Sequence, residues 1–466
     1  MSTKYDKDVN DLLNKLQGRL GDLETNQAYY EASYRLKALG LAVPPEMRHL
    51  TAAVGWPRMY LDSIEERLDI DDFRLAHKPE GDERLRDWWQ ANFMDVESGL
   101  GHLESMIHGI SYITVSAPNE DENPDIPLMK VESPFCFITD DDYRTGKPKA
   151  ALRHYKNLEL PQEDYVTLYL PDETVGLARG GPMAEWRVDY AVKHELGRVL
   201  CSPLVNRERL TERCGRSEIT NELRSVTDAA SRMTMNLQAA AELMALPQRI
   251  IFGVSAGDFP VDPDIPGSAM EAYLGRIMAF ENEGGKAVQF QAGELRNFVE
   301  SLQELAKQVA AYTGLPPQYL SFSSDNPASA EAIKSSEARL VKKAERKARL
   351  FGRSWEEAMR LGMLVIDGDI PKDAYKLETV WRDPSTPTFA SKADAVQKLH
   401  SQGIIPTEQA RIDLDYTDVQ REQMRKWDQE NPMGQLQALM SQAPVKNQIS
   451  MQQQQAAQAS KKPVTN

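Results

Sequence analysis

The chain has 466 residues, of which 41% are hydrophobic and 27% charged, and its formal net charge is −15 at pH 7. This composition predicts a soluble globular protein of roughly two to four domains. The sequence contains no apolar run near the roughly 18 to 20 residues of a membrane-spanning helix, and its polar first residues give no secretory signal, so we expect neither a membrane nor a secreted protein. Proteins that hold nucleic acid through its phosphates are basic, and the acidic balance therefore argues against tight phosphate binding.

The first hundred residues are predicted to be helical. Apolar residues recur from Val9 to Leu23, which indicates a helix over 9–39 that ends at Gly40. Pro57 is placed to open a second helix. The apolar residues of that helix are Tyr60, Ile64 and Leu68. A third helical region, 83–109, carries Trp88, Trp89, Phe93, Leu100, Leu103 and Ile107, and we expect its aromatic side chains in the core.

Residues 110–204 have a different pattern. Short runs rich in β-branched and aromatic residues alternate with polar turns, which predicts an antiparallel sheet with hairpin-like connections. The runs are 110–115, 134–138, 150–155, 165–170 and 185–188.

A long amphipathic helix is predicted over 217–246, because its apolar residues recur every three or four positions until Pro247 ends it. At about 1.5 Å per residue it would span roughly 45 Å. Its apolar stripe comprises Ile219, Leu223, Val226, Ala230, Met233, Leu237, Ala240 and Met244.

A second amphipathic helix is predicted over 294–313, after a Pro- and Asp-rich stretch at 257–266 and a short helix near 268–281. Gly314 is placed to end it. Its stripe comprises Leu295, Phe298, Leu302, Leu305, Val309 and Tyr312.

The longest predicted helix, about 328–362, follows a polar loop at 321–327. Nine Lys or Arg and five Asp or Glu residues lie between Glu331 and Arg360, which predicts a solvent-facing surface of ion pairs. A small helical unit follows at 387–430, with Pro406 opening one of its helices, and nine glutamines from position 434 onward predict a disordered tail.

Two segments match part of a known catalytic motif but lack the rest of it. Gly253-Val-Ser-Ala-Gly257 matches the nucleophile elbow of serine hydrolases, with Ser255 as nucleophile, but the proline-rich segment after it cannot start the helix that this elbow needs. His194-Glu195 begins as a zinc-protease motif does, yet Arg198 stands where the second histidine is required.

The remaining motifs do not describe a cofactor site. Gly284-Gly-Lys286 lacks the upstream glycine and the following Ser or Thr of a phosphate-binding loop. The acidic runs at 120–122 and 140–142 lack the glycine and spacing of a calcium loop. Reduced thiols are expected of the three widely spaced cysteines, Cys136, Cys201 and Cys214. We predict no catalytic residue, no cofactor and no metal.

Six short segments, none of them a catalytic motif, carry a resemblance to a known family. They are Ser202-Pro-Leu-Val-Asn-Arg207, Gly215-Arg-Ser-Glu-Ile219, Leu246-Pro-Gln-Arg249, Tyr312-Thr-Gly-Leu-Pro-Pro-Gln-Tyr-Leu320, Asp325-Asn-Pro-Ala-Ser-Ala-Glu-Ala-Ile333 and Trp355-Glu-Glu-Ala-Met359. As an ordered set they resemble the portal proteins of long-tailed, siphovirus-type bacteriophages, particularly those infecting actinobacteria. The resemblance covers about residues 25 to 430.

The resemblance implies an α+β, mainly helical portal fold with wing, stem, clip and crown, which assembles into a ring of about twelve subunits. The parts it implies are 1–109 (N-terminal helical region of the wing), 110–215 (β-rich wing), 216–249 (first stem helix), 250–292 (clip), 293–314 (second stem helix), 315–330 (tunnel loop), 331–386 (long helix and return to the wing), 387–433 (crown) and 434–466 (disordered tail).

The resemblance also implies roles for particular residues. The tunnel loop would face DNA through Ser321, Ser323, Ser324, Asp325, Asn326 and Pro327. The stem would pack through Ile219, Leu223, Val226, Met233, Leu237, Leu295, Phe298, Leu302, Leu305 and Val309. The clip would meet its partners through Asp258, Phe259, Asp262 and Asp264.

The implied partners are further copies of the chain, double-stranded DNA passing through the channel, the terminase large subunit, the head–tail adaptor, and the major capsid and scaffold proteins, with no membrane. The implied place is the portal vertex of the virion, after assembly in the host cytoplasm. Twelve chains at −15 each would carry −180, and an acidic channel wall would repel phosphate and let DNA slide. Two alternatives stay open, a non-portal minor head or scaffold protein and a serine hydrolase that uses Ser255.

Overall fold

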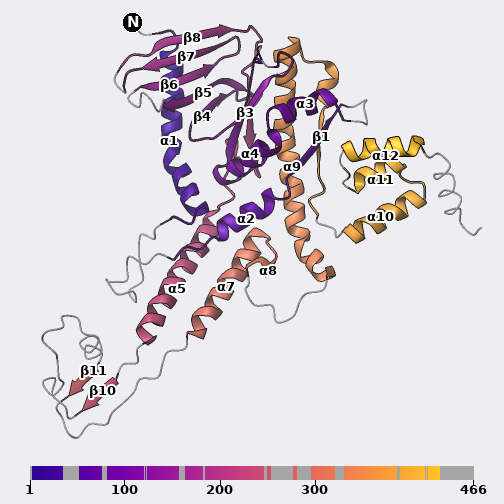
Figure 1. Ribbon diagram of the computed structural model, residues 1–466. Coiled ribbons are helices and arrows are strands. Elements are labelled where there is room, and N and C mark those ends of the chain that lie inside the picture. The colour runs from indigo at the N-terminus through magenta and orange to yellow at the C-terminus, as the bar shows by residue number, and fades with distance from the viewer. Residues whose placement is uncertain are drawn as a thin grey trace, which may run out of the picture. The chain divides into compact units, whose positions relative to one another are not determined.

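The part of the chain that the computed structural model describes comprises residues 3–34, 52–75, 81–119, 121, 123–156, 163–181, 184–245, 249–252, 277–280, 295–320, 330–385, 389–414, 416 and 418–430. The chain forms two compact units, residues 1–384 and 385–466 (Figure 1). Helices and strands both occur throughout the first unit, and this mixture confirms the predicted α+β class. Among the described residues, no helix is both long and apolar enough to cross a membrane.

The first unit contains a five-stranded antiparallel sheet, and its strands lie side by side in chain order. They are β4 (Phe137–Asp141), β5 (Pro148–Lys156), β6 (Asp164–Tyr169), β7 (Glu173–Arg179) and β8 (Arg187–Lys193). Helix α1 (Asp6–Tyr30) lies along one face of this sheet (Figure 1) and buries Val9, Leu12 and Leu16 against Leu152 and Val166. The hairpin-like connections predicted for this region are confirmed.

A separate three-stranded sheet corrects the prediction of a single sheet. Strand β2 (Ile110–Ser116) pairs antiparallel with β3 (Leu128–Glu132) on one side and with β9 (Cys201–Val205) on the other. Strand β2 is thus the central strand of this sheet, and β4 to β8 form a sheet of their own. Only the last residue of β2 is not buried, and Tyr112 packs on Phe137 of the larger sheet with ring centroids 4.8 Å apart.

Helix α1 ends earlier than predicted, at Tyr30 rather than near Gly40. Ala32 adopts a left-handed conformation with φ 53°, and the N–H of Ser33 donates to the carbonyl of Ala28. This is a Schellman ending, in which a left-handed residue turns the chain so that the last carbonyls are satisfied.

The helical region predicted over 83–109 is two helices, α3 (Glu83–Ala91) and α4 (Met94–His108), because Phe93 takes a left-handed conformation between them. Trp88 and Trp89 lie in the core as predicted. The core prediction is wrong for Phe93, which is 76% exposed.

Helix α2 (Trp56–Glu65) begins with Pro57 in its first turn, as predicted, and buries Tyr60 and Ile64. It packs against α4 and α9 (Ala330–Asp367), the longest helix. Strand β1 (Ile70–Arg74) follows α2 and pairs antiparallel with β12 (Glu378–Trp381), which follows α9 and the short 3₁₀ turn Lys372–Lys376.

Helix α9 runs through the core rather than along the surface. Phe351 and Trp355 are fully buried, the Ser354 hydroxyl donates to the Pro203 carbonyl of β9 at 2.8 Å, and the Ser202 hydroxyl of β9 donates to the Ser354 carbonyl at 2.8 Å. The prediction that its charged residues form a solvent-facing surface is wrong for Lys347, which is 1% exposed. Lys347 stands on the same stripe as the buried apolar residues and therefore faces inward.

The second unit contains three described helices. They are α10 (Phe389–Ser401), α11 (Thr407–Asp413) and α12 (Asp418–Glu430). Pro406 immediately precedes α11, as predicted. Ion pairs join α11 to α12, with Glu408 next to Arg425 at 2.7 Å and Arg411 next to Asp428. The tail beyond residue 430 lies outside the described residues.

Candidate functional site

Two long helices, α5 (Asn221–Ala245) and α7 (Arg296–Thr313), lie side by side in the first unit (Figure 1). Gly314 ends α7 in a left-handed conformation with φ 81°, as predicted, and the short helix α8 (Pro317–Leu320) follows. Between α5 and α7 the described residues form one parallel strand pair, β10 (Arg249–Phe252) and β11 (Ile277–Phe280).

The residues predicted to pack the two long helices fall into two groups. Those near the core are buried and belong to one apolar cluster, and they are Ile219, Leu223, Val226 and Val309. Those farther out are half-buried, and they are Met233, Leu237, Leu295, Phe298, Leu302 and Leu305. The sequence pattern missed four small or flexible side chains that are buried instead, namely Met235, Ala239, Ala306 and Ala310.

Two predicted groups lie outside the described residues. They are the tunnel-loop set, Ser321, Ser323, Ser324, Asp325, Asn326 and Pro327, and the clip set, Asp258, Phe259, Asp262 and Asp264. Ser255 and the Gly284–Lys286 motif lie outside them as well.

A cluster of buried charges lies at the base of α5, just before its first residue, and we call it the base cluster (Tyr60, Asn206, Glu218, Lys343 and Lys347). Tyr60 Oη donates to Glu218 Oε2 at 2.7 Å, and Asn206 Nδ2 donates to Glu218 Oε1 at 3.1 Å. Lys347 forms an ion pair with Glu218 and donates to Asn206 Oδ1 at 2.6 Å. Lys343 Nζ lies 3.3 Å from the second oxygen of Glu218.

The electrostatics of the base cluster keep Glu218 ionised. Burial alone would raise the pKa of Glu218, but the ammonium groups of Lys347 and Lys343 outweigh it and hold that pKa well below its ordinary value. Burial and the adjacent Glu218 carboxylate raise the pKa of Tyr60, which therefore stays a hydrogen-bond donor. A carboxylate that is 6% exposed and contacted by four donors is fixed in place.

The loop between β9 and α5 supplies Asn206 and Glu218 of the base cluster. Asn206 follows β9, and its N–H donates to the Gly109 carbonyl at 2.8 Å. Gly215 has φ 78°, and a Cβ there would lie 1.8 Å from that same Gly109 oxygen, so only glycine fits. Two of the resembling segments therefore have a structural role here, since 202–207 forms most of β9 and the beginning of this loop, and 215–219 forms its end.

Sequence reasoning missed Lys347 and Tyr60 as partners of Glu218. A signal was present on α9, because Lys347 continues the helical stripe of the buried residues Leu340, Ala344 and Phe351. A lysine at such a position indicates a buried acidic partner elsewhere in the chain.

The described part of the chain contains no grouping of three or more His, Cys, Asp or Glu residues that could hold a metal ion. His194-Glu195 lies in a loop after β8, and Arg198 pairs there with Glu357 of α9. The acidic run at 140–142 ends in a capped turn, where hydrogen bonds from Thr145 lower the pKa of Asp142 to about 2.

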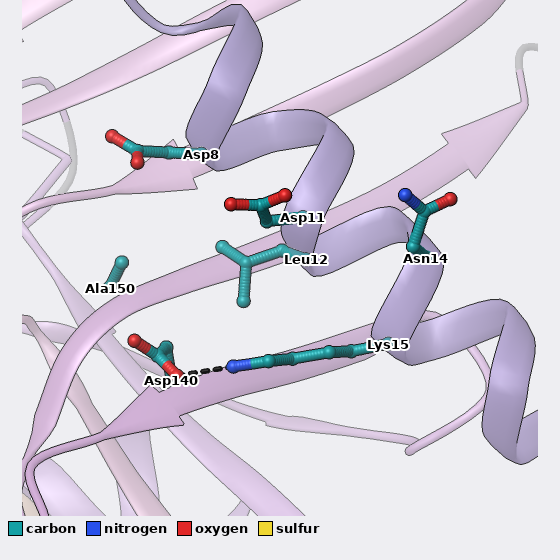
Figure 2. Close-up of a pocket in the computed structure, with 7 residues that line it drawn as sticks. All are labelled: Asp8, Asp11, Leu12, Asn14, Lys15, Asp140 and Ala150. Carbon is teal, nitrogen blue, oxygen red and sulfur yellow. Dashed lines mark hydrogen bonds and ion pairs between the residues drawn. The ribbon is translucent and has the colours of Figure 1, made fainter.

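A surface hollow of about 460 Å³ lies between α1 and the strands β4 and β5 (Figure 2). Asp8 and Asp11 line it from α1, and Lys15 closes one side through an ion pair with Asp140. The hollow has carboxylates but no nucleophile next to a base, so its lining describes no active site.

Comparisons with known proteins agree on one family. The family model described as phage portal protein, SPP1 Gp6-like, matches residues 10–436. The portal protein of Mycobacterium phage D29 is 49% identical over 428 residues, which cover 90% of this chain and 88% of that protein. The portal protein of Mycobacterium phage L5 is 48% identical over 430 residues, which cover 90% and 87%. A chain in the neck of a native GTA particle, computed with C12 symmetry, covers 78% of this chain and 91% of its own length at 11% identity, but its TM-score of 0.38 is too low to support an inference.

Proposed function

The chain belongs to the family of SPP1 Gp6-like phage portal proteins and functions as a portal protein, and from this premise we propose that about twelve copies form a ring at one vertex of the capsid. Viral double-stranded DNA would enter the head through the ring during packaging and leave through it during ejection. The observation that carries the proposal is the 49% identity to a portal protein over 90% of this chain.

The helix pair α5 and α7 suits the stem that surrounds the channel. The main apolar cluster includes α5 only as far as Val226 and α7 only from Leu305 onward, so the outer halves of both helices lie beyond it. Half-buried apolar residues on those outer halves would be covered by the same helices of neighbouring copies. The segment at 250–292 would then be the clip, and the helices α10, α11 and α12 would belong to the crown.

The base cluster would fix the stem at the point where it leaves the wing. Its members come from α2, the loop after β9, the residue before the first turn of α5, and α9. A buried ion pair with complete hydrogen bonding accepts few alternative geometries, because any rotation of α5 would leave a charge without a partner. The stem of every copy would therefore leave the wing at the same angle, as a closed ring requires.

The channel is proposed to conduct DNA without gripping it. An acidic wall repels phosphate, and the proposed tunnel loop at 321–327 contains no Lys or Arg to bind it. Replacing Asp325 and Asn326 together by arginine is therefore expected to slow or stall DNA translocation and to leave ring assembly intact. Packaging would be timed in a reconstituted motor assay, with the double variant Asp325→Ser/Asn326→Ser as control. A packaging rate equal to that of the wild type in the arginine variant would refute the sliding proposal.

The partners proposed for this ring are the terminase large subunit, which would supply the energy, and later the head–tail adaptor. The clip residues Asp258, Phe259, Asp262 and Asp264 are proposed to meet them. Major capsid and scaffold proteins would surround the wing in the virion, after assembly in the host cytoplasm.

The first test of the whole proposal is the mass and shape of the purified chain, by mass photometry with negative-stain imaging. A ring of about twelve chains with an axial hole about as wide as duplex DNA supports it. A compact dimer, even with capsid scaffold protein present, would overturn it. Esterase activity that disappears in Ser255→Ala would favour the hydrolase alternative.

A further inference from the structure

The exposed side of α4 presents an apolar strip next to a groove. Val96 and Leu100 are 67% and 53% exposed, and their i, i+4 spacing places them on one side of the helix. Phe93, the residue just before the helix, is 76% exposed. A groove of about 390 Å³ lies between α4 and the end of α2, with Leu68 and Leu103 in its lining. Such a strip on a soluble protein marks a surface that another molecule covers.

The rim of this groove is acidic. Residues 62–71 contain five Asp or Glu and one cation, Arg67, which is only 7% exposed and donates to the Tyr319 hydroxyl of α8. Arg382 also lines the groove and pairs with Asp69 and Asp71, and Arg58 pairs with Asp62, so among the described residues Glu65 and Glu66 are the carboxylates of this stretch without an ion-pair partner. Burial and the neighbouring carboxylates raise the pKa of Glu65, and among the described residues no cation lies within ion-pair distance of it. We call this surface, made by residues 62–71 and 93–100, the acidic groove.

A second surface of the same unit has the opposite charge. The loop 207–216 contains four arginines and two glutamates, and both glutamates are already partnered, one by Lys347 and one by Arg216. The adjoining turn at 142–149 adds three cations and one aspartate, which Lys149 pairs at 3.4 Å. We call residues 142–149 and 207–216 the basic knob.

Apolar side chains project from the basic knob. Leu210 is 86% exposed and Tyr143 is 81% exposed. The Arg213 guanidinium lies 3.8 Å from the Tyr143 ring centroid and donates to the Tyr143 carbonyl at 3.2 Å, which holds the two loops together. Arg207 donates to the Leu210 carbonyl at 2.9 Å and fixes that loop from within. The knob is therefore a pre-formed projection with aromatic and arginine anchors, the residue types that dominate interface energetics.

We propose that the occupant of the acidic groove is the basic knob of a second copy of this chain. Charge complementarity is the argument, because exposed apolar residues are bordered by an excess of negative charge on the groove and by an excess of positive charge on the knob. Two different surfaces that fit each other make a head-to-tail contact, and such contacts close into rings when the rotation between copies allows it. This inference rests on the proposed ring and names the contact that closes it.

Charge reversal tests the pairing. The groove variant is Glu66→Lys/Glu97→Lys, and the knob variant is Arg144→Glu/Arg209→Glu. Each variant turns two attractive charges of the pairing into repulsive ones, so the fraction of chains in rings, measured by mass photometry at fixed concentration, is expected to fall at least about tenfold for either variant alone. The control is Lys372→Glu/Lys376→Glu, which changes exposed charges away from both surfaces.

An equal mixture of the groove and knob variants makes the test specific. In a ring where the two alternate, every groove meets a knob of opposite charge, so rings are expected to return to near the wild-type fraction. The pairing is overturned if either variant alone forms rings as the wild type does, or if the mixture stays dissociated while both variants melt like the wild type. If the wild type itself forms no ring, the proposed function fails and this pairing fails with it, whereas wild-type rings with unaffected variants refute only the pairing.

Discussion

Replacing Lys347 by methionine is expected to loosen the base of α5. Methionine has a similar length and no charge, so Glu218 would stay buried with one cation fewer, and Asn206 Oδ1 would lose its donor. Breaking a buried ion pair by removing one partner typically costs about 3 to 5 kcal/mol. Lys343 remains 3.3 Å from Glu218, so we expect a loss at the lower end, about 3 kcal/mol.

Amide hydrogen exchange measures this loss locally. A loss of about 3 kcal/mol in the free energy of opening corresponds to roughly a hundredfold faster exchange for amides in residues 218–226. Exchange in α10, α11 and α12 of the second unit serves as the internal reference. The matched control is Lys342→Met on the same helix, since the Lys342 side chain is 72% exposed and its surface pair with Glu345 contributes little.

A double variant separates the pair from its surroundings. In Glu218→Gln/Lys347→Met neither charge remains, so at least half of the lost protection is expected to return. Exchange in Lys347→Met within about threefold of the wild type, a difference below about 0.7 kcal/mol, would show that the base cluster does not hold α5 and would refute the reasoning.

Two further predictions concern the loop before α5 and the core. Gly215→Ala is expected to lower the melting temperature clearly more than Gly146→Ala. Both glycines have positive φ, but only at position 215 would the new Cβ collide with a backbone oxygen, that of Gly109. Equal shifts of the melting temperature for the two variants would show that the collision does not matter. Burial lowers the pKa of His102 to about 3, so between pH 6.5 and 3 the folded protein binds fewer protons than the unfolded chain. The contribution of His102 to the free energy of unfolding is therefore complete above pH 6.5 and declines by up to about 1.4 kcal/mol per pH unit as the pH falls toward 3. His102→Gln can still accept the 2.9 Å hydrogen bond from Trp355 and does not titrate, so melts between pH 6.5 and 4 are expected to decline less steeply; an unchanged slope would contradict this.

Local steric rules explain which helix boundaries could be predicted. Pro57 and Pro406 lie at the beginnings of helices and Gly314 at an end, because proline fits a first turn and glycine the left-handed position after the last one. The ending at Ala32 and the break at Phe93 gave no such signal, since neither residue favours positive φ. Tertiary packing fixes the backbone at those two positions, and the periodicity of a single sequence carries no information about that packing.

The sheets and the base cluster show the same limit. Short runs of β-branched residues indicated strands, but they could not show that β2 would be paired on both edges by β3 and β9. Charge spacing on α9 indicated exposed ion pairs, whereas Lys347 meets Glu218 across 129 positions of sequence. The tunnel-loop and clip residues stay predictions.

The covering of the five-stranded sheet by α1 has a consequence for synthesis on the ribosome. Val9, Leu12 and Leu16 leave the exit tunnel early, but the strands they cover end with Leu177 in β7, about 160 residues later. At roughly 5 to 20 residues per second, the apolar face of α1 waits on the order of ten to thirty seconds for its partner. During that interval the nascent chain exposes the apolar face of an amphipathic helix, which is open to chaperones and to aggregation until its sheet has been synthesised.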